Sequence, residues 1–248
     1  MSSTLPARSD GRAADELRPI KVTEDFVSSA EASFFVEIGR TRILCCATLD
    51  EDIPRWLKGK GKGWVTAEYN LLPRSTSQRV KRERTGASGR TQEIQRLIGR
   101  SLRGVCNLEN LGERHLIIDC DVLEADGGTR TASVVGGFLA MARALQRMKA
   151  ALPQSFPQGQ VLKNFMAAVS VGLMDSRPLL DLCYTEDSEA DVDMNVVMTD
   201  TGDFVEIQGT GEESVFSRAQ LDSLLGLAEK GCKELITMQQ GLLGLQLP

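Results

Sequence analysis

The chain contains a single histidine, His115, among its 248 residues. A catalytic dyad or a metal site built on several histidines is therefore excluded. No run of about 18 apolar residues occurs, so we expect no membrane-spanning helix. Residues 1–17 lack the apolar core that a secretory signal needs, and their composition predicts a polar, partly disordered N-terminal tail.

The six cysteines form no Cys-x-x-Cys pair, and most of them lie in apolar stretches. This placement favours buried, reduced thiols in a cytoplasmic protein over disulfides or a zinc site. An apolar content of 42% and a charged content of 25% are those of a soluble globular protein. The length is sufficient for one large domain or two small ones.

The net charge of −5 is unevenly distributed along the chain. Between Arg55 and Arg103 there are 13 lysines and arginines against three acidic residues, whereas Asp175 to Glu213 contains 12 acidic residues and a single arginine. A basic segment in an acidic protein suggests a polyanionic partner that touches one region only. The alternative at this point is a solvated face that keeps the protein in solution.

Strand and helix patterns alternate along the sequence. Helices are predicted from residue 91 to 105, from 131 to 148 and from Ser217 onward, where Ser217 and Gln220 fit a capping box. Strands are predicted at 34–49 (two strands around a Gly-Arg turn), 64–69, 115–123, 165–173, 179–184, 194–199 and 204–208. Residues 74–90 contain almost nothing apolar, so we expect a loop long enough to suggest a function. This order predicts layered α and β structure in two similar halves, about 18–150 and 161–248.

The stretch ADGGTRTAS, residues 125–133, lies between a predicted strand and a predicted helix. The N–H groups at a helix N-terminus bind anions, and two glycines allow a ligand to approach the backbone closely. Thr129, Thr131 and Ser133 offer hydroxyl groups, and Arg130 offers a planar fork for a phosphate or a carboxylate. Phosphate is the simplest ligand, although a Gly-Gly turn with a threonine cap would show the same residues.

A second candidate site, residues 184–197, places five acidic residues within eight positions just before an apolar strand. Such crowding becomes tolerable if a cation binds or a proton is shared. Oxygen ligands suit Mg²⁺ or Mn²⁺ better than zinc. The alternative is a solvated acidic loop.

Four segments of the sequence, taken together, closely resemble signature segments of the ribonuclease PH family of phosphate-dependent 3′ exoribonucleases. They are GWVTAEYNLLPRST, GRTQEIQRLIGRSLR, DCDVLEADGGTRTAS and EDSEADVDMNVVMT, and the resemblance spans roughly residues 6–240. It implies an α+β fold of the ribonuclease PH type, in which a mixed β-sheet is layered with helices in two related βαβ-like halves of a single catalytic domain, residues 18–248. It also implies a cytoplasmic homohexamer built as a trimer of dimers. Expected substrates are tRNA precursors and other RNA 3′ ends, shortened with inorganic phosphate to release nucleoside diphosphates in a reversible reaction. Roles in rRNA processing or RNA decay stay open.

The resemblance also implies roles for individual residues. Arg90, Gly128, Thr129 and Arg130 match the phosphate-binding positions, and Asp187 and Asp193 match an acidic pair linked to Mg²⁺ (or Mn²⁺) binding and proton transfer. Catalysis is therefore expected of Asp187, Asp193 and Arg90. The RNA-contacting region is matched by Arg74, Arg79, Lys81 and Arg82.

Two other functions are compatible with parts of this pattern. A catalytically silent ring subunit of an exosome-like assembly would usually lack part of the acidic pair or the phosphate arginine, and this chain has all of them. A small-molecule kinase with a phosphate turn would leave the basic stretch 74–90 without a purpose.

Overall fold

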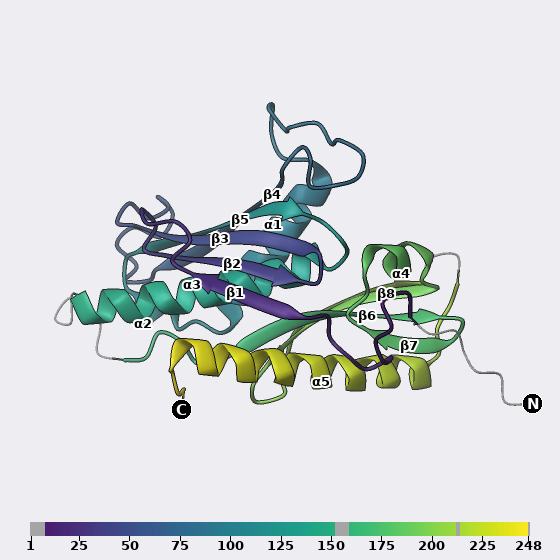
Figure 1. Cartoon of the computed structure of the whole chain (residues 1–248). Helices are drawn as coiled ribbons and strands as arrows, with labels where there is room; N and C mark the ends of the chain where they lie inside the picture. Colours follow the sequence, from purple (N-terminus) through teal and green to yellow (C-terminus); the bar gives the residue numbers. More distant parts are fainter. Residues whose placement is uncertain (1–7, 152–158, 212–213, 248) are drawn as a thin grey trace, which may run out of the picture.

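Two β-sheets and the helices between and below them make up the molecule (Figure 1). The computed structural model describes residues 8–151, 159–211 and 214–247. The first sheet has the order β1-β2-β3-β5-β4. Its strands are β1 (Ile20–Glu24), β2 (Ala32–Ile38), β3 (Thr41–Asp50), β4 (Trp64–Leu71) and β5 (His115–Glu124). All neighbours are antiparallel except β4 and β5, which are parallel and joined through α1 (Gly89–Gly104) and the short α2 (Leu108–Leu111).

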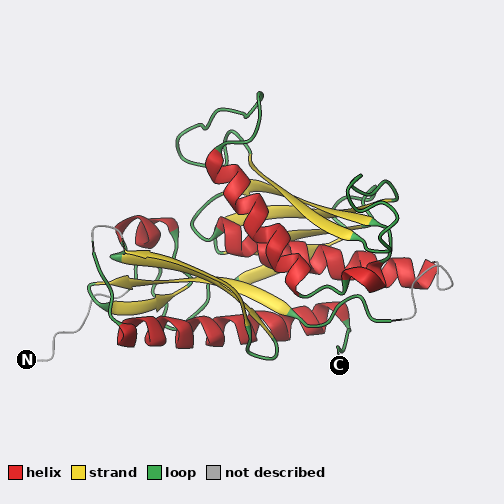
Figure 2. Cartoon of the chain, turned by 180° about the vertical axis from the view of Figure 1, so that it is seen from behind, coloured by secondary structure: helices red, strands yellow, loops and turns green. Residues whose placement is uncertain are grey.

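The second sheet is wholly antiparallel, with the order β7-β6-β8-β9. Its strands are β6 (Met166–Met174), β7 (Arg177–Leu180), β8 (Val192–Thr199) and β9 (Phe204–Gly211). The long helix α5 (Arg218–Leu243) covers one face of this sheet, and the short helix α4 (Tyr184–Glu189) lies at the opposite face (Figures 1 and 2). Gly231 allows the close approach of α5, because a Cβ there would come within 2.8 Å of Leu180.

Helix α3 (Thr129–Ala151) lies between the two sheets and contacts β2, β3 and β5 on one side and β6 on the other. Apolar or small side chains surround most of it, which explains why this helix is buried on nearly all sides. At Gly136 an added Cβ would come within 2.6 Å of the Cys45 sulfur. One continuous hydrophobic core therefore runs from the first sheet through α3 to the second sheet and α5.

Most of the predicted elements are confirmed. The strand pair around Gly39, the strand at 64–69, the loop at 74–90, the helices and the Ser217 cap are all present. The predicted strand at 179–184 is wrong beyond Leu180, because Asp181 adopts a φ of +53° and Tyr184 begins α4. Strand β1 and helices α2 and α4 were not predicted.

The six cysteines are free thiols, as predicted, and five of them are buried. Burial raises the pKa of Cys106 and that of Cys232 to about 12. In the described part of the chain, no helix has the length and apolar character needed to cross a membrane.

The part of the expected N-terminal tail that the structure describes, residues 8–17, packs against the body of the protein. Arg8 and Arg12 are buried against the loop between β7 and α4. Arg18, at the end of this segment, is 4% exposed. Composition alone did not indicate this burial, because the acidic partners of these arginines are far away in the sequence.

Candidate functional site

The Gly127–Gly128 turn forms the N-terminus of α3. Both glycines have positive φ values, +77° and +65°, which other residues adopt only with strain. The Ala132 N–H donates to the Gly128 carbonyl over 3.0 Å, which makes Gly128 the residue that caps the helix. Since glycine has no side chain to accept hydrogen bonds, it cannot cap the first N–H groups of α3 as a serine or threonine would, and an anion can take that role.

The same turn packs closely against the start of α4. A Cβ on Gly127 would lie 2.6 Å from the Leu182 carbonyl oxygen and 2.8 Å from the Tyr184 nitrogen. Any larger residue would therefore push the candidate phosphate turn away from the start of α4, the helix that carries Asp187.

Arg130, in the first turn of α3, is held in place by the second sheet and by α1. Its Nη1 donates to Gln208 Oε1 on β9 over 2.6 Å, and its Nη2 lies 3.7 Å from Glu93 Oε2 on α1. Gln208 in turn donates to Glu93 over 3.0 Å. The guanidinium is only 17% exposed, so its orientation is set before any ligand arrives.

Thr129, Tyr69 and Arg90 complete this group. The hydroxyl groups of Thr129 and Tyr69 are hydrogen bonded at 2.8 Å, and Tyr69 is 3% exposed. Burial raises the pKa of Tyr69, while the hydrogen bond with Thr129 and the positive charges of Arg90 and Arg130 act in the opposite direction. Both guanidinium groups are therefore near this hydroxyl, although Arg90 itself is exposed at the start of α1.

These residues form a positively charged corner at a helix N-terminus. Two guanidinium groups, backbone N–H groups and the hydroxyl of Thr129 can together bind a small dianion such as phosphate. The three predicted phosphate-binding residues of the turn, Gly128, Thr129 and Arg130, are adjacent in sequence, and the fold adds Arg90 from a different element.

Asp193 lies on the sheet face that adjoins this corner. In the antiparallel register Asp193 is opposite Thr210, and Asn195 is opposite Gln208, the partner of Arg130. Residues two apart in a strand share a face, so Asp193, Asn195 and Gln208 are on the same side of the sheet. Asp193 is half-buried there.

Asp187 is exposed on α4, four residues after the Cys183 N-cap. Across the described ranges, no group of three or more histidine, cysteine, aspartate or glutamate residues is arranged to hold a metal ion. Two carboxylates alone do fit Mg²⁺, which keeps several waters and commonly binds one or two carboxylates together with the phosphates of a substrate. Residues 184–197 form α4 and most of β8, so the alternative of a simple solvated loop does not describe this segment.

The predicted RNA-contacting residues lie in the long loop between β4 and α1, which projects from the top of the molecule (Figure 1). Arg74, Arg79, Lys81 and Arg82 are all exposed. Arg74 donates to the Ser77 carbonyl over 3.2 Å, a contact within the loop itself. The loop thus presents several positive charges to solvent.

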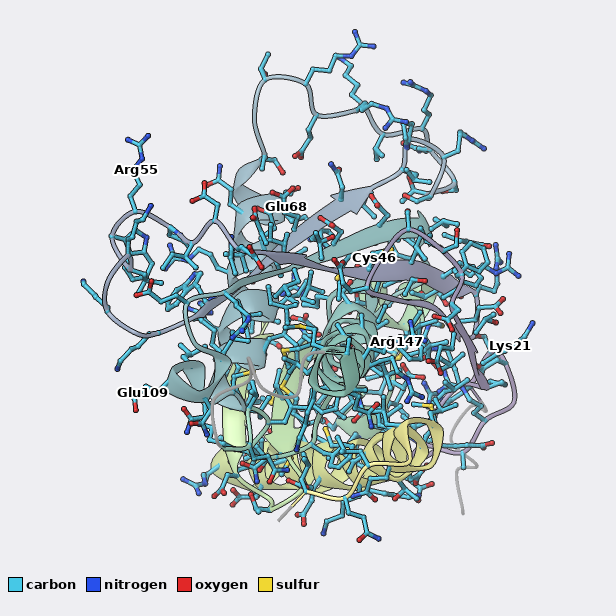
Figure 3. The ribbon with its side chains drawn as sticks, turned by 90° about the vertical axis from the view of Figure 1, so that its left-hand side faces the viewer. Lys21, Cys46, Arg55, Glu68, Glu109 and Arg147 are labelled. Atoms are coloured by element: carbon cyan, nitrogen blue, oxygen red, sulfur yellow. The ribbon has the colours of Figure 1, made fainter. Side chains whose placement is uncertain are left out.

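Beneath this loop, the outer face of the first sheet is acidic. Figure 3 shows Glu68 and Cys46 on this face, while Arg55 points away into solvent. Glu68 on β4 is opposite Asp119 on β5. Burial first, and then the charges of Glu68 and Asp121, raise the pKa of Asp119; burial likewise raises the pKa of Asp121, against the lowering effect of Arg82.

Several residues of this site were not identified by sequence reasoning. Tyr69 and Glu93 lie within the quoted segments but were given no role, and Gln208 lies outside them. Asp181 and Glu186 bind Arg18 and Arg8 across 163 and 178 residues. No local pattern in the sequence indicates contacts at such separations.

Comparison with known proteins places the whole chain in one group. Residues 16–145 match the model of the 3′ exoribonuclease family, domain 1, and residues 164–231 match its domain 2. The chain is 55% identical over 245 residues to a Bacillus subtilis protein named ribonuclease PH, covering 97% of this chain and 98% of that protein. It is 51% identical over 246 residues to the ribonuclease PH of Corynebacterium efficiens, covering 98% and 99%.

Solved structures with a similar fold are more distant in sequence. The crystal structure of rice Rrp46 has a TM-score of 0.76 at 17% identity and covers 95% of this chain and 100% of that chain. A structure of the Archaeoglobus fulgidus exosome with RNA bound to the active site has a TM-score of 0.77 at 19% identity, covering 94% and 92%. These likenesses confirm the α+β fold.

Proposed function

The chain belongs to the ribonuclease PH family of 3′ exoribonucleases, and from this premise we propose how its residues carry out the reaction. The protein is a phosphate-dependent exoribonuclease that shortens tRNA precursors from the 3′ end. Inorganic phosphate is the co-substrate, nucleoside diphosphates are the products, and the reverse reaction adds nucleotides to a 3′ end. Other RNA 3′ ends are substrates of the same chemistry.

The observation that carries this assignment to the site is the arrangement at the N-terminus of α3, where Thr129 is hydrogen bonded to Tyr69 and Gln208 and Glu93 hold Arg130 in place, with Arg90 at the start of α1 as the second guanidinium. These groups orient a phosphate ion so that one of its oxygens attacks the terminal phosphorus of the RNA in line with the leaving 3′ oxygen. Positioning and charge stabilisation provide most of the catalysis in such transfers. The N–H groups of α3 hold the remaining phosphate oxygens.

Asp187 and Asp193 are assigned to the chemical step. One of the two carboxyl groups protonates the leaving 3′ oxygen. Together they would hold Mg²⁺ or Mn²⁺, which supplies neutralisation of the charge that develops on the phosphates. The support for this pair is the position of Asp193 on the sheet face shared with Gln208, the partner of Arg130.

The basic loop is assigned to the RNA body. Arg74, Arg79, Lys81 and Arg82 are exposed and project beyond the first sheet, so they can follow a phosphate backbone at a distance from the reacting end. The acidic face beneath them repels RNA and keeps the strand on the loop.

The assembly is a homohexamer, a trimer of dimers. Support comes from the family and from large apolar side chains that one chain leaves in solvent, including Trp56 at 55% and Tyr184 at 60% exposure. Light scattering should give a mass near six times 27.1 kDa, with dimers as the fragment. A stable monomer with full activity on tRNA would refute the assembly.

The function is tested by incubating the protein with a tRNA that carries a 3′ extension, with and without phosphate. Chromatography of the released nucleotides distinguishes the possible reactions. Nucleoside diphosphates that form only when phosphate is present support phosphorolysis. Monophosphates released without phosphate would show a hydrolytic enzyme, and no release would fit a silent ring subunit.

A further inference from the structure

Arg18 connects the phosphate turn to the segment that leads into α4. It is 4% exposed, and its Nε and Nη2 donate to the two carboxylate oxygens of Asp181 over 2.9 and 2.6 Å. Its Nη1 donates to the Asp126 carbonyl over 2.5 Å. A single buried side chain thus holds two segments that are 55 residues apart in the sequence, and this geometry is the bidentate one in which arginine binds most strongly.

The contacts of Arg18 and of Thr41 fix the orientation of the turn. The Thr41 hydroxyl donates to the Gly127 carbonyl over 2.7 Å. This carbonyl is one residue after the Asp126 carbonyl that accepts from Arg18. The described residues contain no cis peptide, and in a trans peptide the C=O and the following N–H point in opposite directions. The N–H groups of Gly127 and Gly128 are therefore directed away from Arg18 and Thr41.

Arg8 holds the other end of the same loop. Its Nε and Nη2 donate to the two oxygens of Glu186 over 2.8 and 2.7 Å, and its Nη1 donates to the Leu180 carbonyl over 2.8 Å. The Glu186 carboxylate also accepts from the Cys183 N–H over 3.0 Å. Glu186 directly precedes Asp187, so the position of α4 depends on this buried ion pair.

Arg12 completes the buried cluster between the two others. Its Nη2 donates to the Asp181 carbonyl over 3.1 Å, and it lies 3.6 Å from the carboxylate of Asp181 and 3.7 Å from that of Glu186. The side chains of Arg8, Arg12 and Arg18 are at most 6% exposed. Removing one partner from such a cluster leaves a buried charge uncompensated, which is strongly destabilising. The side chains of the cluster are therefore held in one arrangement.

We propose that residues 8–18 form an arginine clamp in which Arg18 is a positioning residue for phosphate binding and Arg8 is a positioning residue for the chemical step. Neither side chain touches a substrate. Arg18 acts through the Asp126–Gly128 turn, and Arg8 acts through Glu186 and α4. This inference rests on the proposed function for its kinetic readout, and on the contacts above for its structural one.

The first experiment measures steady-state phosphorolysis in Arg18→Gln, Arg18→Lys and Arg8→Gln, with the exposed Arg218→Gln as the matched control. Arg18→Gln should raise the KM for phosphate about tenfold, which corresponds to about 1.4 kcal/mol, with RNA affinity unchanged. Arg8→Gln should instead lower kcat about tenfold with little change in the KM for phosphate. Arg18→Lys keeps the charge without the planar fork and should recover only part of the loss.

The second experiment measures hydrogen–deuterium exchange of the full-length variants without substrate. Exchange in residues 126–131 should rise in Arg18→Gln, exchange in residues 183–189 should rise in Arg8→Gln, and neither should rise in Arg218→Gln. If the glutamine variants do not fold, the comparison is made with Arg18→Lys and Arg8→Lys.

These readouts separate the clamp from the proposed function. Folded variants with the kinetics and local exchange of the wild type overturn the clamp, and so does a uniform rise in exchange with kcat and KM unchanged. A wild-type protein that releases no diphosphates overturns the proposed function, while a localised rise in exchange still supports the clamp.

Discussion

Replacement of Arg130 by alanine should selectively weaken phosphate binding. A hydrogen bond to a charged group contributes roughly 1.5–3 kcal/mol, which corresponds to about 10- to 150-fold in affinity. Arg130 is 17% exposed, so solvent weakens this interaction little. However, one of its five N–H groups already donates to Gln208, and the Glu93 carboxylate 3.7 Å away already compensates part of its charge. We therefore expect a rise in the KM for phosphate near the lower limit, about tenfold.

The assay is a phosphate titration of diphosphate release from an RNA with a 3′ extension. Arg90→Ala should behave like Arg130→Ala, and the double variant should lose less than the sum of the two, because both side chains bind the same ion. Arg130→Lys should recover part of the affinity, since an ammonium lacks the planar fork. RNA affinity without phosphate should change little. An unchanged KM for phosphate in Arg130→Ala would show that the turn is only structural and that phosphate binds elsewhere.

Three other outcomes follow from the described contacts. Replacing Arg74 and Arg79 with alanine should weaken tRNA binding and reduce its log–log salt slope by roughly 0.7–0.9 per lost phosphate contact; an equal loss on very short oligonucleotides would contradict an anchoring role. Asp187→Asn and Asp193→Asn should each abolish most turnover while RNA binding, measured by titration, stays near normal; near wild-type turnover would show that the residue is misassigned. Burial raises the pKa of Glu186, but the hydrogen bonds from Arg8 and the Cys183 N–H outweigh this effect, and the pKa is lowered. The lowered pKa stabilises the folded protein at pH values above the ordinary carboxyl pKa, and this stabilisation is lost as the pH falls through the lowered value. Denaturant midpoints measured between about pH 5 and 2 should therefore fall more steeply for the wild type than for Glu186→Gln, and parallel curves would argue against this ion pair.

Elements with a strong local signal could be predicted from the sequence. The apolar stripe of α1, the Ser217 cap of α5 and the Gly39 turn each follow from residues only a few positions apart. The turn at 125–133 was also accessible, because glycines, hydroxyl groups and an arginine before a helix have few joint explanations. The loop at 74–90 was predicted from the near absence of apolar residues.

What could not be predicted depends on partners distant in the sequence. The N-terminal arginines were assigned to a polar, partly disordered tail, because nothing near them in the sequence indicates contacts with Asp181 and Glu186. Helix α4 was missed because its six residues are too short for a periodic pattern and rich in acidic side chains. Gln208 and Glu93, which hold Arg130 in place, come from β9 and α1, and only the folded chain brings them together.

The position of α3 between the two sheets links the stability of the protein to its activity. The residues at its first turn hold the proposed phosphate site, and the rest of the same helix is the shared interior wall of both layers. A change in packing near Gly136 has no solvent-facing side of the helix along which to relax, because the residues around it are buried on all sides. Amino-acid substitutions in the interior of this protein are therefore constrained by catalysis as well as by folding, even at positions far from any substrate.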